Sequence, residues 1–453
     1  MVPRAWASRT GRRTVAGFYV GLPLSSLLLL RQPLLTTAVV AVEWLAVLVI
    51  VSPEVFISGA AFFCTAVPKA GFIVAGLPLP LMMFVLLLSA AVLRVLAGSG
   101  NNSGSRLLVL ALGWLGYRLA ALHLNGGTTI DLAALAGWYG LPLALLIAGP
   151  AIGSLAGRIS RSWSRCLENG ILFACGFSLV QQFAGIEQTV VPGVTRAVGA
   201  DYASKPLAFS GGSKIPSTYQ NGNILGVVTA MFFLISADRV VRGRGTRRDL
   251  LIMAGTAVST ILGGSRTALI GLALGLGLLI LRSGLRRQTI TIIALCVVVA
   301  GLTLHLSPAL ANRLTGTSAA DPALAQRTVV WSMVLRSSSV RELLTGGAAW
   351  ADPPDASGLG EGFIGAMQQV GLVGMGLFLG VFLVVTRPAH LRRWRLLLIP
   401  VGVSLAVDSA YLVFPTLFLP IGRMFAPIDS DYDVASEHSP PMARYDDAAA
   451  PPR

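Results

Sequence analysis

Apolar segments long enough to cross a lipid bilayer follow one another along most of this chain, and their repetition limits the possible folds more than any other feature. A transmembrane helix needs about 20 apolar residues. We predict spans at 14–30, 34–51, 55–67, 71–95, 106–122, 131–149, 167–184, 220–237, 249–264, 267–281, 289–306 and 362–386, with one or two more in 396–425. The sequence therefore predicts an all-α polytopic integral membrane protein with about 12–14 transmembrane helices.

Composition supports this interpretation and excludes several function classes. The 453 residues are 54% hydrophobic and only 12% charged, with a mean hydropathy of +0.73, which is outside the range of soluble globular domains. The net charge of +15 comes from arginines between apolar spans, so we interpret it as an orientation signal and expect no nucleic-acid partner. The four cysteines lack CxxC spacing, and we expect neither a metal site nor a cofactor.

The distribution of arginine predicts the topology. If the basic N-terminus, residues 1–13, is cytoplasmic, the arginine-dense connectors at 94–106, 158–165, 238–249, 282–287 and 387–395 are cytoplasmic too. The transmembrane domain then covers residues 14–425, with two long connectors facing outward at 185–219 and 307–360. Residues 426–453 are rich in Asp, Pro, Ala and Ser, and we expect them to be disordered.

Ionisable residues inside a bilayer are expensive and therefore mark candidate functional sites. Arg118 in the fifth span lies near the outer end of its predicted helix, where its guanidinium could bind an anion. Pairing with Glu43 in the second span is an equally good explanation.

Two polar breaks between apolar segments are further candidates. Residues 261–268 read ILGGSRTA, which places Arg266 at a predicted helix start with free backbone N–H groups, a suitable place for a diphosphate. Asn221 and Asn223 open the eighth span from the same outward side and could donate to sugar hydroxyls or phosphate. Either asparagine could equally be a helix cap, and Arg266 could be an ordinary interfacial arginine.

The long outward connector at 307–360 supplies the remaining candidates. Arg327 and Trp331 are one helical turn apart, so they would share a face of a short amphipathic helix that could contact a sugar phosphate. Glu361 begins the helix that follows, where its carboxylate could accept the proton of a sugar hydroxyl. A glutamate at a helix N-terminus is also stabilising through the helix dipole alone.

The order and spacing of these motifs resemble the bacterial O-antigen ligase and O-antigen polymerase superfamily. The similarity covers residues 219–382 and includes the stretches QNGNILG at 220–226 and GSRTALI at 264–270, the pair Arg327 and Trp331, and the glycines at 362, 371 and 374. The resemblance implies a GT-C-like glycosyltransferase in the bacterial inner membrane that needs neither metal nor nucleotide sugar. Its donor would be an oligosaccharide on undecaprenyl diphosphate. Its other partners would be membrane lipid and polysaccharide assembly proteins.

The resemblance also implies roles for individual residues. Arg266 matches the arginine of an Arg-x-x-x-Leu motif, with Ile270 in the leucine position, and Arg327 matches a loop arginine; both would bind the diphosphate. Ligases of this family carry a His-Asn pair where this chain has Gly360-Glu361, which favours a polymerase and makes Glu361 the candidate base. A ligase acting on another acceptor and a flippase for lipid-linked sugars are the alternatives.

Overall fold

The computed structural model describes the chain in segments, most of which are helical. They comprise residues 53–68, 73–74, 77–78, 102–125, 158–191, 195, 214–219, 222–283, 287–306, 329, 332–333, 335–336, 338–346, 367, 370–377 and 380. The only extended pairing among them is a two-residue antiparallel ladder of Ile73–Val74 with Leu77–Pro78, called β1 and β2. The all-α fold class is therefore confirmed for the part of the chain that the structure describes.

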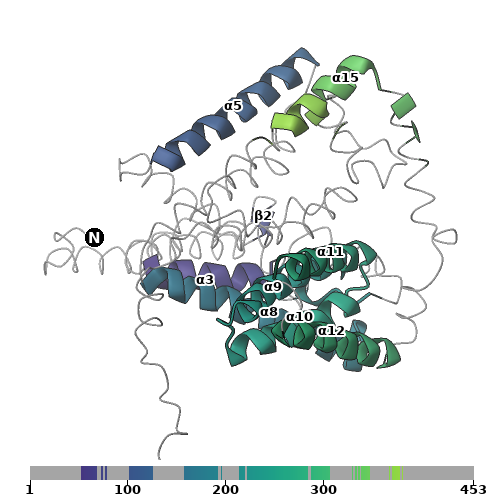
Figure 1. Cartoon of the computed structure of the whole chain (residues 1–453). Helices are drawn as coiled ribbons and strands as arrows, with labels where there is room; N and C mark the ends of the chain where they lie inside the picture. Colours follow the sequence, from purple (N-terminus) through teal and green to yellow (C-terminus); the bar gives the residue numbers. More distant parts are fainter. Residues whose placement is uncertain are drawn as a thin grey trace, which may run out of the picture.

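Six helices pack into one bundle (Figure 1). They are α3 (Pro53–Ala66), α8 (Arg158–Ala184), α9 (Gly222–Val241), α10 (Arg247–Leu262), α11 (Arg266–Ser283) and α12 (Arg287–Leu306). The central helix is α9, which is buried along nearly its whole length and packs against α10, α11 and α12. Helix α8 lies between α3 and α10, and two single 3-10 turns, η3 (Glu187–Thr189) and η6 (Ser217–Tyr219), adjoin its end.

A second group of helices is formed around α5 (Asn102–Leu124), which Figure 1 shows beside α15 (Val340–Thr345). The short α15 begins with a capping box, in which Ser339 and Glu342 exchange hydrogen bonds between side chain and backbone, and it ends at Gly346. These bonds to the carboxylate lower the pKa of Glu342. The helical stretch at 370–377 follows and bonds to α5.

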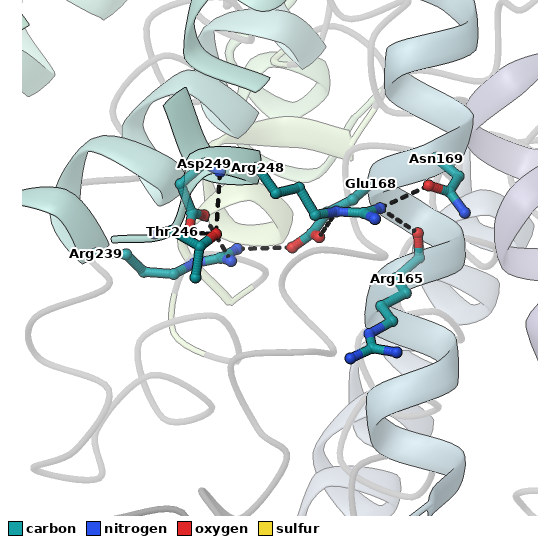
Figure 2. Close-up of polar contacts among 7 residues, drawn as sticks. All are labelled: Arg165, Glu168, Asn169, Arg239, Thr246, Arg248 and Asp249. Atoms are coloured by element: carbon teal, nitrogen blue, oxygen red, sulfur yellow. Dashed lines mark hydrogen bonds and ion pairs between the residues drawn. The ribbon is translucent and has the colours of Figure 1, made fainter. Parts of the chain in front are cut away.

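One end of the bundle gathers arginine side chains around two buried carboxylates (Figure 2). Glu168 on α8 accepts bonds of 2.9 Å from Arg239 on α9 and from Arg248 on α10. Arg239 also pairs with Asp249 at 2.8 Å, and Asp249 caps α10 by accepting from the backbone of Thr246 at 2.9 Å. The network therefore links three helices where α9 ends and α10 begins.

The helices agree with most of the predicted spans that fall on described residues. The spans predicted at 55–67, 106–122, 167–184, 220–237, 249–264, 267–281 and 289–306 correspond to α3, α5, α8, α9, α10, α11 and α12. The spans at 14–30, 34–51, 131–149 and 396–425 lie outside the described residues, and the span at 362–386 is helical at 367, 370–377 and 380.

Two boundaries were wrong. The span predicted to begin at residue 71 is not helical where the structure describes it, because residues 73–74 and 77–78 pair as a hairpin. Pro78 and Pro80 explain the difference, since proline lacks the N–H that a helix interior requires. The cytoplasmic connector predicted at 158–165 is the beginning of α8 instead, so that this helix extends beyond the apolar segment.

Candidate functional site

The start of α9 crosses the turn between α10 and α11 at backbone contact. A Cβ atom on Gly263 would lie 2.6 Å from the carbonyl oxygen of Gly222, and a Cβ on Gly222 would collide with the carbonyl of Gly263. Only glycine at both positions allows this approach. Gly264 follows with φ of 61°, a left-handed conformation that lets the chain reverse into α11. The two polar breaks identified in the sequence are therefore neighbours in space.

Arg266 and Asn223 lie on the two sides of this crossing. Arg266 is the first residue of α11, as predicted, and its side chain is half-buried. Asn223 is the second residue of α9, and its side-chain oxygen accepts a hydrogen bond from Lys214 Nζ at 2.6 Å. Both helices direct their N-terminal N–H groups toward this end of the bundle, which favours an anion. We call the group Lys214, Asn223, Gly263 and Arg266 the α9–α11 junction.

Lys214 was missed in the sequence. It lies in the connector at 185–219, three positions before the 3-10 turn η6, and the backbone N–H of the next residue, Ile215, donates to Leu262 O at 3.0 Å. The available signal was composition, since the chain has three lysines among its 35 basic residues, and one of them lies seven positions before Asn221.

Arg118 lies in the second group of helices, where it contacts backbone carbonyls. Its side chain is 0% exposed, and Nη1 donates to Thr345 O at 2.6 Å and to Val370 O at 3.4 Å. One turn away on α5, Trp114 Nε1 donates to Gly374 O at 2.8 Å. These bonds fasten both α15 and the 370–377 helix to α5.

The C-terminal end of α15 and the beginning of the 370–377 helix are in contact. Gly371 has φ of 69°, and a Cβ atom there would lie 2.5 Å from the backbone nitrogen of Gly346. Asn125 adds a side-chain bond to Thr345 Oγ1 at 3.1 Å. Residues 344–346 and 370–371 are therefore in contact near the C-terminal end of α5, and Arg118 bonds to both stretches.

The other predicted site residues lie outside the described residues: Asn221, Arg327, Trp331 and Glu361. The short helix predicted around Arg327 and Trp331 has helical residues at 329, 332–333 and 335–336. The described residues hold no group of three or more His, Cys, Asp or Glu side chains placed to bind a metal ion. The partner of Arg118 suggested by the sequence, Glu43, is also outside the described residues.

Comparison of the chain with protein-family models, with curated proteins and with solved structures finds no match. The interpretation of the site therefore depends on its geometry and on the chemistry of its side chains.

Proposed function

We propose that the protein is a polytopic glycosyltransferase of the bacterial inner membrane that polymerises lipid-linked oligosaccharides. The donor is an oligosaccharide on undecaprenyl diphosphate, and the acceptor is a sugar hydroxyl of another lipid-linked repeat. The observation that carries the proposal is the α9–α11 junction, where a lysine and an arginine lie beside two helix N-termini. Such an arrangement suits a phosphate-containing ligand.

A membrane location is supported by the lengths and surfaces of the helices. Among the described residues, α9 and α11 are long and apolar enough to cross a membrane, although the core helix of a soluble protein can meet the same criteria. On helix α11, Ile270, Leu274 and Leu278 are exposed and follow one another at intervals of one helical turn, so they form an apolar stripe. Leu281, near the end of the same helix, is 82% exposed. A stripe of this kind is favourable against lipid and unfavourable against water.

The polarity of the bundle supports the proposed orientation. Eight exposed or half-buried arginines lie near the start of α8, where α9 ends and α10 begins, and where α11 ends and α12 begins, and Figure 2 shows three of them. We call this the arginine-rich end: Arg165, Arg239, Arg242, Arg244, Arg247, Arg248, Arg282 and Arg287. Helix α9 connects this end to the α9–α11 junction. Its 20 residues span about 30 Å, which equals the thickness of the hydrocarbon core of a bilayer. An arginine-rich cytoplasmic end puts the junction on the outward face.

The proposed reaction is a single displacement. The oxygen of the acceptor hydroxyl forms a bond to the anomeric carbon of the donor, and the bond from that carbon to the diphosphate oxygen breaks. Undecaprenyl diphosphate leaves with the electron pair, and the hydroxyl proton passes to a base, for which Glu361 is the sequence-based candidate. Arg266 stabilises the charge that grows on the leaving diphosphate.

Replacing Arg266 tests this role. In a strain that lacks the native gene, we expect Arg266→Ala, produced at normal level, to reduce polymer formation about 100-fold or more and to accumulate single lipid-linked repeats, because the leaving group is no longer neutralised. Gel analysis of the polysaccharide and mass analysis of the lipid-linked pool measure both effects. Arg282→Gln, at the exposed opposite end of the same helix, is the control. Full-length polymer from Arg266→Ala would exclude the phosphate role.

A further inference from the structure

Lys214 brings a second cationic side chain to the α9–α11 junction from a separate segment. Its Nζ donates to Asn223 Oδ1 at 2.6 Å, in the first turn of α9. The backbone beside it is fixed to the end of α10, because Ile215 N donates to Leu262 O at 3.0 Å. Hydrogen bonds therefore fix both the ammonium group of Lys214 and the backbone next to it.

The packing around Gly222 shows how close Lys214 lies to the turn that leads into α11. A Cβ atom on Gly222 would be 3.1 Å from Lys214 Cβ and would overlap the carbonyl of Gly263. Lys214 and Gly263 thus both lie close to Gly222. Arg266 begins α11 three positions after Gly263. The fold therefore gathers two cations that are distant in sequence at one crossing of the backbone.

The residues that anchor this segment are buried and hydrogen-bonded. Ser217 N donates to Gln181 Oε1 at 2.7 Å, and Ser217 Oγ donates to Ala174 O at 2.7 Å, both on α8. Tyr219 OH donates to Thr65 O on α3 at 2.7 Å. Ser217 has φ of 51°, a strained conformation for a residue with a side chain, which these bonds maintain. The position of Lys214 is thus set by contacts to α3, α8 and α10.

We propose that Lys214 is the second phosphate-binding residue of the junction and that it selects a diphosphate over a monophosphate. The inference rests on the proposed function and concerns the headgroup of the same lipid ligand. Arg266 contacts one phosphate through its planar guanidinium, and the ammonium of Lys214 contacts the other as a compact charge. Asn223 accepts one of the three ammonium protons and thereby aims the group.

Equilibrium binding to the purified full-length protein in detergent tests the inference, with undecaprenyl diphosphate and undecaprenyl monophosphate as the two probes. We expect the native protein to prefer the diphosphate about tenfold or more, the contribution of one charge-assisted hydrogen bond. Lys214→Gln should remove this preference and leave monophosphate binding within about threefold, because glutamine retains an N–H for Asn223 but no charge. Lys214→Arg should retain the preference.

The control is Arg247→Gln, which removes the same charge from an exposed position at the arginine-rich end and should change neither affinity. An unchanged diphosphate preference in Lys214→Gln would overturn the inference and leave the proposed function intact. Equal losses in Lys214→Gln and Lys214→Arg would also overturn it, because charge would then not be the determinant. If the native protein bound neither lipid, the proposed function itself would fail.

Discussion

At the scale of single residues, Arg118 and Arg266, the two sequence-selected arginines that the structure describes, have different surroundings. Arg266 is half-buried at a helix start, directly after the turn at Gly263 and Gly264, which is a suitable setting for a ligand. Arg118 is fully buried and donates to carbonyl oxygens on both sides of the connector between α15 and the 370–377 helix. Its geometry indicates that it holds α15 and the 370–377 helix together beside α5.

Arg118 should therefore contribute strongly to stability. We expect Arg118→Met to remove the hydrogen bonds to Thr345 and Val370 and to leave buried carbonyls unpaired, at a cost of about 2–3 kcal/mol. Thermal unfolding of the purified protein in detergent measures the loss. Arg341→Gln is the matched control, since Arg341 is exposed and donates to Leu124 O at 2.9 Å on the same helix. Equal melting temperatures for native protein and Arg118→Met would contradict the positioning role.

At the scale of elements, helix positions were predictable and their contacts were not. Apolar length alone located α9, α10, α11 and α12, because each of these helices coincides with a long apolar segment of the sequence. Hydropathy placed the start of the span at 71–95 too early, because a hydropathy value does not reflect that Pro78 interrupts a helix.

The candidate site was predictable only in part, for a similar reason. The break at 261–268 and the start of α9 were both recognised as polar interruptions, and Arg266 was correctly placed at a helix start. Their direct contact depends on the absence of side chains at Gly222 and Gly263, which a one-dimensional pattern does not pair. Lys214 was missed because it lies in a connector, where a single lysine carries no periodic signal.

The network of Figure 2 should be the principal polar link between α8, α9 and α10. Glu168 is buried between two arginines, so Glu168→Gln leaves both cations without their shared carboxylate. We expect a loss of about 2 kcal/mol, less than for a fully buried pair because the arginines are partly exposed. Thermal unfolding measures it. Asp238→Asn should cost under about 1 kcal/mol, because its pair with Arg242 spans one turn of a single helix. Equal effects of the two substitutions would contradict this ranking.

At the scale of the whole molecule, the described bundle has two chemically different ends. Helices α9 and α10 meet at the arginine-rich end through Arg239 and Asp249, and they meet at the opposite end through Gly222 and Gly263. The arginine-rich end contains the arginines of the connectors that the sequence analysis predicts to be cytoplasmic, at 158–165, 238–249 and 282–287. The proposed lipid-linked donor presents its diphosphate at a membrane surface, so the α9–α11 junction, at one end of the bundle, suits this proposed ligand better than a site at the midplane would.

The orientation is testable with introduced cysteines in a variant whose four native cysteines are replaced. Gln188 and Arg282 are both exposed, at the two opposite ends of the bundle. We expect Gln188→Cys to react with a membrane-impermeant maleimide in intact spheroplasts, and Arg282→Cys to react only after lysis, since arginine-rich ends face the cytoplasm. Labelled protein is quantified on gels. Labelling of Arg282→Cys from outside would contradict the orientation, and equal labelling of both before lysis would contradict a membrane-spanning bundle.

The central claim is that this protein forms glycosidic bonds between lipid-linked glycans, and reconstitution of the purified protein tests it most directly. Liposomes would contain the protein and an undecaprenyl-diphosphate-linked oligosaccharide, with a metal chelator present and no nucleotide sugar. Mass analysis should then detect lipid-linked glycans of two or more repeats together with free undecaprenyl diphosphate, and Arg266→Ala should form neither. Movement of labelled lipid across the bilayer without any new glycosidic bond would contradict the account and indicate a transporter.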